Sequence, residues 1–186
     1  MNRGGGWFSF QSDPSGKSEP TIVELEPNRT GFHVLELEID STQKLVLKNA
    51  FVNKTRFNIY KDEIKETARF AKWIESLPAG RIVMITITDT AIAAKRPPGK
   101  ALYEALQLLG ASTTMERIGY RQPFAMIGMK GAPPGTASQA MDKTKILLRM
   151  EGTFVHGKGS AASGQVAFSD PSIERTDITE LMLSED

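Results

Sequence analysis

The chain has 186 residues, a length that suits one domain with terminal arms. Hydrophobic residues make up 40% and charged residues 24%, which excludes a fibrous or a wholly disordered protein. The absence of cysteine excludes a disulfide framework, zinc–thiolate and iron–sulfur centres, and thiol catalysis. With two histidines and a formal net charge of +1, we expect no metal site, no cofactor and no nucleic-acid partner.

The N-terminal residues lack the apolar stretch of a signal peptide, and no run of about 18 apolar residues occurs. We therefore expect a cytoplasmic or virion protein that neither inserts into a membrane nor is secreted by a signal peptide. Residues 1–20 hold four of the 16 glycines and two of the ten prolines. This composition predicts an extended Gly-rich arm with an apolar patch over residues 7–10, and a disordered leader is the alternative.

Residues 21–155 have the periodicity of one folded domain. Alternation of apolar and polar residues predicts half-buried strands, and a nearly continuous β-branched run at residues 81–88 predicts a central strand covered on both faces. Strands are expected over residues 21–26, 32–39, 45–49, 81–88, 124–129 and 145–154.

Two helices are expected between these strands. Helical spacing over residues 61–77 predicts a buried face of Ile64, Ala68, Ala71 and Ile74, with Leu77 as a further candidate. The prolines and glycine at residues 97–99 open a second helix over residues 100–109. Its buried face is expected to consist of Leu102, Ala105, Leu106 and Leu109.

Residues 156–186 are expected to form a loop or hairpin and an acidic C-terminal tail. The Gly/Ser/Ala run at residues 157–164 predicts a flexible loop or hairpin tip, and residues 166–168 a returning strand. The region 151–186 has two basic and seven acidic residues, against 19 basic and 13 acidic in the region 21–150. This asymmetry allows docking within the chain or between copies, and a solvated tail is the alternative.

Catalytic motifs are absent from the sequence. The run at residues 152–159 approaches a phosphate-binding loop, but Gly159 stands where a Ser or Thr would ligate magnesium. No nucleophile elbow and no His-Glu-x-x-His pair occurs. His33 lies within an expected strand, where a structural imidazole is favoured. We therefore expect a protein that is not an enzyme, with no catalytic residues.

Polar residues stand at the ends of two expected strands. Asp89 directly follows the central strand, and Arg121 precedes the last apolar strand, with Tyr120 and Phe124 beside it. Arginine offers a forked donor, aspartate accepts from hydroxyl groups, and aromatic faces cover apolar parts of a ligand. Asp89, Arg121, Tyr120 and Phe124 are therefore candidate ligand-binding residues. The alternative is a structural salt bridge, or two unrelated surface residues.

Three stretches together resemble one family. They are a Gly-hydrophobic strand pair at residues 30–51, a Gly-Arg-Ile-strand-Asp segment at residues 77–89, and a long block at residues 106–133 that contains Tyr120-Arg121. In spacing and order they resemble the interleukin-like EMT-inducer family, also called GG domains. The resemblance implies an α+β, β-rich domain of packed antiparallel or mixed sheets with flanking helices, here carrying extended N- and C-terminal arms. It also implies no catalysis.

The resemblance also suggests a ligand. The stem domain of protein O-mannose N-acetylglucosaminyltransferase resembles this family and binds β-linked N-acetylglucosamine through a strand-end Asp and an Arg, which correspond to Asp89 and Arg121. The chain departs from the family pattern, because Gln122 stands in place of an acid, Phe124 in place of a tryptophan, and Thr30 in place of a basic residue. The cysteines of the secreted members are missing.

These observations favour a non-catalytic recognition module built into a larger assembly, such as a bacteriophage tail or particle surface. Its expected partners are neighbouring subunits and a cell-surface glycan. One alternative is a structural or decoration subunit of a virion without glycan binding. Another is a secreted, cytokine-like signalling protein, which the absence of a signal peptide disfavours.

Overall fold

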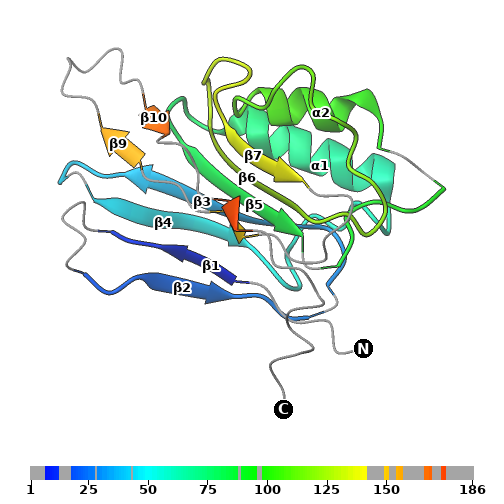
Figure 1. The fold of residues 1–186 in the computed structure, drawn as a ribbon, viewed down its shortest axis with the longest axis horizontal. Coiled ribbons are helices and arrows are strands. Elements are labelled where there is room, and N and C mark those ends of the chain that lie inside the picture. The colour runs from blue at the N-terminus through cyan, green and yellow to red at the C-terminus, as the bar shows by residue number, and fades with distance from the viewer. Residues whose placement is uncertain are drawn as a thin grey trace.

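The protein folds as a β-rich α+β domain (Figure 1). The computed structural model describes residues 7–12, 18–27, 29–42, 44–87, 89–95 and 98–141, together with the backbone of four short strands further along the chain. Within this part of the chain no helix is long and apolar enough to cross a membrane.

A five-stranded antiparallel sheet forms the centre of the fold, in the order β4-β3-β5-β6-β7. Its strands are β3 (Phe32–Ile39), β4 (Leu45–Phe51), β5 (Ile82–Ile87), β6 (Phe124–Met129) and β7 (Ser138–Met141). The apolar, β-branched run of β5 lies in the middle position, as predicted, because such a strand has to be covered on both faces.

Two helices, α1 (Glu63–Ser76) and α2 (Lys100–Gln107), cover one face of this sheet (Figure 1). The main core lies between them and the sheet. Phe32 is fully buried there and packs edge-on against Phe70 of α1, with ring centroids 5.6 Å apart. The buried face of α2 consists of Leu102, Ala105 and Leu106, as predicted, but the helix ends two residues earlier than predicted. Leu109 is buried just after its end.

The predicted buried face of α1 is wrong in part. Ile64 is 81% exposed and Ala68 is also exposed, whereas the buried residues are Thr67, Phe70 and Ile74. The helix is oriented so that Phe70 faces the sheet. Burying the Phe70 ring removes more apolar surface from water than burying Ile64 and Ala68 would, because these two lie at the margin of the apolar face.

Strands β1 (Trp7–Phe10) and β2 (Thr21–Glu24) pair antiparallel and lie alongside β4 (Figure 1). The buried side chains of β1 pack against the second face of the large sheet. Phe8 and Phe10 belong to a core cluster with Leu35 and Leu37 of β3. The apolar patch at residues 7–10 is therefore part of the folded unit, in contrast to the alternative of a disordered leader.

Further along the chain two short pairs are described: β8 (Arg149–Met150) with β11 (Ile173–Glu174), and β9 (Phe154–His156) with β10 (Val166–Phe168). The β9–β10 pairing agrees with the expected returning strand. Most of the strand predicted over residues 145–154, the loop at 157–164 and most of the acidic tail lie outside the described residues. Strand β7 was not predicted, because its sequence Ser-Gln-Ala-Met has no β-branched or aromatic residue.

Candidate functional site

The candidate site lies at the end of the sheet where β5 stops. Asp89 is half-buried there and is followed by Thr90, which is 2% exposed. The N–H of Gly31, just before β3, donates to the carbonyl oxygen of Thr90 at 2.6 Å. This bond brings the segment before β3 against the segment after β5.

Arg121 reaches the same place from the turn that precedes β6. Its backbone N–H donates to Oγ1 of Thr90 at 3.1 Å, so the Arg121 backbone contacts the residue that directly follows Asp89. The exposed guanidinium has its Cζ 5.1 Å from the ring centroid of Tyr120, which is 44% exposed. The structure thus brings the Tyr120–Arg121 turn to the residue that follows Asp89, although 31 residues separate Asp89 from Tyr120 in the sequence.

The backbone of Arg121 is unusual, because its φ of 54° lies in the left-handed region. This conformation costs a non-glycine residue roughly 1–2 kcal/mol, and such residues gather at functional sites. The turn is fixed by Gln122, which is buried and accepts the N–H of Gly119 through Oε1 at 2.6 Å. Gln122 therefore serves the turn as a neutral hydrogen-bond acceptor.

The structure places Phe124 in the core instead of at the surface of the site. Its side chain is 1% exposed and stacks on Phe32, with ring centroids 5.9 Å apart. The reason is strand parity, since Phe124 and Met126 both point from β6 toward the helices. Asp89, Tyr120 and Arg121 are the predicted residues that have exposed or half-buried side chains at this edge.

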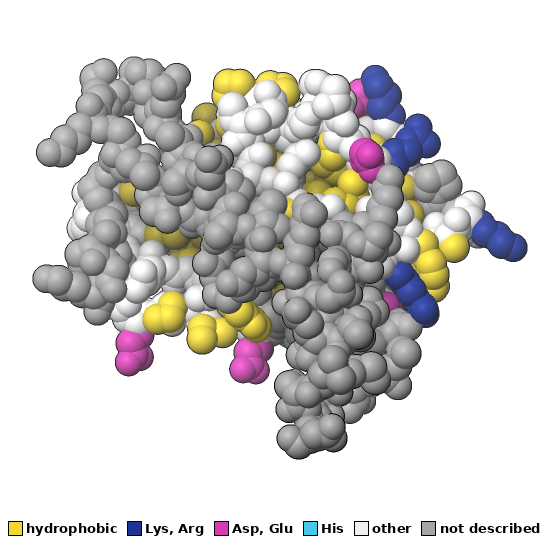
Figure 2. Space-filling view, viewed as in Figure 1, with side chains coloured by type: hydrophobic (Ala, Val, Ile, Leu, Met, Phe, Trp, Pro, Cys, Tyr) yellow, Lys and Arg dark blue, Asp and Glu magenta, His cyan; other side chains and the backbone are white. Residues whose placement is uncertain are grey.

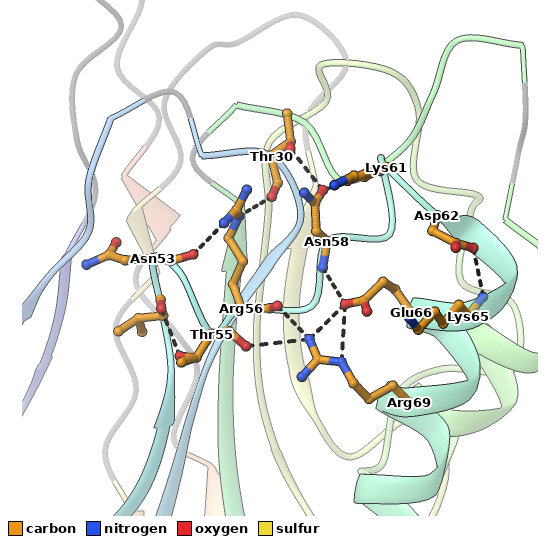
Figure 3. A network of polar contacts seen from close by, with 11 residues as sticks. Thr30, Asn53, Thr55, Arg56, Asn58, Lys61, Asp62, Lys65, Glu66 and Arg69 are labelled. Atoms are coloured by element: carbon orange, nitrogen blue, oxygen red, sulfur yellow. Dashed lines mark hydrogen bonds and ion pairs between the residues drawn. The ribbon is translucent and has the colours of Figure 1, made fainter.

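A polar network holds the neighbouring segments in place (Figure 3). The Thr30 hydroxyl donates to Oδ1 of Asn58 at 2.9 Å, and the Asn58 N–H donates to Oε2 of Glu66 in α1 at 2.9 Å. Arg69 pairs with Glu66 at 2.7 Å and lies over the Phe57 ring, 4.1 Å from its centroid. The segment before β3 is therefore tied to the β4–α1 connection and, through it, to α1.

The family model described as interleukin-like EMT inducer matches residues 31–132, more than half of the chain. The chain belongs to this family. The matched range contains β3 to β6, both helices, and Asp89, Tyr120 and Arg121. The interleukin-like EMT inducer family is a family of non-catalytic domains. Among curated protein sequences, none matches the chain significantly.

His33 of this interleukin-like EMT inducer domain is fully buried in β3. The Asn53 N–H donates to Nδ1 at 3.3 Å, and Nε2 lies 3.3 Å from the carbonyl oxygen of Arg29, to which it donates. Burial lowers the pKa of His33 to about 4, and the positive charges of Arg56 and Arg29 act in the same direction. The imidazole is thus a neutral structural group, as its place in the strand indicated.

In the part of the chain that the structure describes, no group of three or more His, Asp or Glu side chains could hold a metal ion. Glu36, which is 4% exposed, pairs with Arg81 at 3.1 Å and accepts from Asn49 at 2.5 Å. The Glu36–Arg81 pair joins β3 to the half-buried residue just before β5, and Asn49 of β4 lies beside Glu36.

Two residues of the site were not found from the sequence, Thr90 and Gln122. Neither residue type is typical of a catalytic or ligand-binding motif, and nothing in the sequence around Gln122 indicates its role in the turn. A weak signal exists for Thr90, because it follows the strand-end Asp89 directly and its hydroxyl can bind nearby backbone groups.

Proposed function

We propose that this domain is a non-catalytic recognition module that binds a glycan at the edge formed by Asp89, Tyr120 and Arg121. The observation that carries the proposal is the exposed Arg121, held at a positive φ beside the end of β5 with its guanidinium over an exposed tyrosine ring. Bonds of the turn hold Arg121 in this conformation. A positive φ that costs free energy at an exposed, chemically active side chain is typical of functional sites, and this supports a ligand-binding role.

The three side chains supply complementary contacts for a sugar. The Arg121 guanidinium offers a fork of donors to ring or carbonyl oxygens, and the Asp89 carboxylate accepts from hydroxyl groups. The face of Tyr120 can pack on the apolar face of a sugar ring. The resemblance to the stem domain of protein O-mannose N-acetylglucosaminyltransferase, which binds β-linked N-acetylglucosamine, supports this ligand class.

Replacing Arg121 tests the proposal. We expect Arg121→Ala to weaken binding to a β-linked N-acetylglucosamine disaccharide at least tenfold in an NMR titration, because the donor fork is lost. Arg121→Gly should weaken binding equally and raise the free energy of unfolding by about 1 kcal/mol, since glycine tolerates the positive φ. Arg117→Ala, an exposed arginine in the same connection, is the matched control.

A glycan array identifies the ligand if the disaccharide is the wrong one. The proposal fails if the wild-type domain binds no glycan, or if Arg121→Ala binds as tightly as the wild type. A gain of stability in Arg121→Gly without a loss of binding would make the strained turn irrelevant to the ligand.

A second candidate function, a subunit of a larger assembly such as a bacteriophage tail, is favoured by the outer surface of the β1–β2 pair. Trp7 is 55% exposed and Ile22 is 59% exposed. Ser9 points to the same face of β1 as Trp7, and Ser9 is the cross-strand partner of Ile22 in β2. The side chains of Trp7 and Ile22 are therefore diagonal neighbours on one face of the β1–β2 pair. Figure 2 shows hydrophobic and acidic side chains along the edge where Figure 1 places β2. A neighbouring subunit would cover this surface.

This second function predicts self-association of the wild-type chain. Light scattering after size exclusion should show a mass that rises with concentration, and the double variant Trp7→Ser, Ile22→Thr should stay monomeric. Leu108→Ser, which alters an exposed leucine (40%) of the segment that ends α2, serves as the control and should associate like the wild type. A wild-type monomer at every concentration would contradict self-association.

A further inference from the structure

We infer that Thr90 is the positioning residue of the candidate site, and that its hydroxyl sets the place of Arg121 relative to Asp89. The inference deepens the proposed function, because it concerns the same site, and it adds a residue that is not expected to touch the ligand. It follows from the hydrogen bonds of this one buried side chain.

All hydrogen-bonding capacity of the Thr90 hydroxyl is used. Oγ1 donates to the carbonyl oxygen of Ile92 at 2.9 Å, and it accepts the N–H of Ile92 at 3.2 Å and the N–H of Arg121 at 3.1 Å. A hydroxyl has one donor and two acceptor lone pairs, so no capacity remains for water or ligand. The residue is 2% exposed, which keeps water from replacing these partners.

The main chain of Thr90 adds a third segment. Its carbonyl oxygen accepts the N–H of Gly31 at 2.6 Å. Thr90 therefore joins the segment before β3, the segment after β5 and the turn before β6. Asp89 is its direct neighbour in the chain, so Thr90 links the backbone of Asp89 to the backbone of Arg121.

The bond to Arg121 acts on a strained backbone. With a φ of 54°, Arg121 would relax toward the right-handed or extended regions if its N–H were released. Such a change rotates the Cα–Cβ bond and carries the guanidinium away from the Tyr120 ring. The hydroxyl thus determines where the donor fork points, which distinguishes positioning from a general contribution to stability.

The chain contains a matched control for the loss of a buried hydroxyl. Thr67 of α1 is 4% exposed, and its Oγ1 has no hydrogen-bond partner among the described residues. Thr67→Val and Thr90→Val make the same chemical change at similar burial. The two variants differ because three backbone groups form hydrogen bonds with the Thr90 hydroxyl, whereas the Thr67 hydroxyl has no such partner in the described part of the chain.

The test measures amide hydrogen exchange by NMR in the full-length chain. In the wild type, the Arg121 and Ile92 amides should exchange at least tenfold more slowly than in an unstructured peptide. Thr90→Val should remove this protection and weaken binding of the β-linked N-acetylglucosamine disaccharide at least tenfold. Thr90→Ser should restore both, and Thr67→Val should leave both unchanged.

Two results overturn the inference: an Arg121 amide that exchanges at the unstructured rate in the wild type, or one that stays protected in Thr90→Val. If Thr90→Val does not fold, the exchange rate of the Arg121 amide in the wild type and in Thr90→Ser tests the inference. Protection of this amide in both supports the inference, and exchange at the unstructured rate in either contradicts it. A wild type that binds no disaccharide refutes the proposed ligand, whereas the exchange rates still report on Thr90. The two failures are therefore distinguishable.

Discussion

Replacing Gly31 with alanine is expected to destabilise the domain by about 3 kcal/mol, the sum of a left-handed strain of roughly 1–2 kcal/mol and an overlap of roughly 1–3 kcal/mol. The φ of Gly31 is 105°, and a Cβ atom would lie 2.3 Å from the carbonyl oxygen of Phe57 and 2.8 Å from Cα of Asn58. Both are backbone atoms, so relief requires moving the β4–α1 connection or the segment before β3. Urea unfolding at neutral pH measures the change.

Gly80→Ala separates the two causes. Gly80 also has a positive φ, 83°, but a Cβ atom there would meet nothing within 4 Å. Its replacement should cost about 1 kcal/mol from backbone strain alone. Equal losses in the two variants would show that the contact with Phe57 is not tight. A larger loss at Gly31 should be accompanied by faster exchange of the Arg121 amide, because the displaced segment binds Thr90.

The sheet was predictable because its strands differ strongly from their surroundings. β5 is a nearly continuous apolar run that ends two residues before Asp89, and β6 is an apolar run that ends before Lys130 and Gly131. Each strand is bounded by charged or turn-forming residues, so period and boundary agree. β7 lacks both signals and forms because β6 offers it a hydrogen-bonding edge.

The face of α1 was harder to predict, because two apolar stripes compete on this helix. One passes through Ile64 and Ala68, and the other passes through Thr67 and Phe70, while Ile74 belongs to both. Spacing alone cannot choose between them. The aromatic cluster decides, since Phe70 contacts Phe32 and Phe57 edge-on, and both partners come from outside the helix.

The ends of the predicted strands indicated Asp89 and Arg121 as site residues. The sequence did not indicate Thr90 and Gln122, the residues whose hydrogen bonds hold Arg121 and its turn in place. Phe124 followed the site residues in the chain and was assigned to the ligand, whereas strand parity turns it inward. The Thr90 hydroxyl binds backbone groups of residues 92 and 121. Almost any residue type can supply a backbone N–H, so the types of the partner residues do not indicate this contact. Such supports become visible only in three dimensions.

Lowering the pH from 7 to 4 is expected to remove about 3 kcal/mol of stability through His33. The pKa of His33 is lowered to about 4 in the folded protein, against 6.5 for an ordinary histidine. Below pH 6.5 the unfolded chain binds a proton that the folded chain does not, so stability falls as the pH falls toward 4. Each pKa unit corresponds to about 1.4 kcal/mol. The protonated ring would place a positive charge in a buried position, and Nδ1–H would face the N–H of Asn53.

The control is His33→Gln, which cannot titrate. Urea unfolding at pH 7, 6, 5 and 4 should give a smaller stability at pH 7 for this variant, but a flatter profile that meets the wild-type profile at low pH. His156→Gln, which alters the other histidine, should keep the wild-type slope. Hydrogen bonds from the Lys44 and Thr42 N–H groups and the Thr42 hydroxyl lower the pKa of Asp40 in the folded protein. Asp40 therefore also loses stabilisation as the pH falls toward 4 and below, but it does so equally in wild type and His33→Gln, so the difference between the two profiles still reports on His33. Parallel profiles for wild type and His33→Gln would mean that His33 becomes charged in the folded protein as easily as in the unfolded chain. The hydrogen bond from the Asn53 N–H to a neutral His33 ring would then not be what joins β3 to the loop at Asn53.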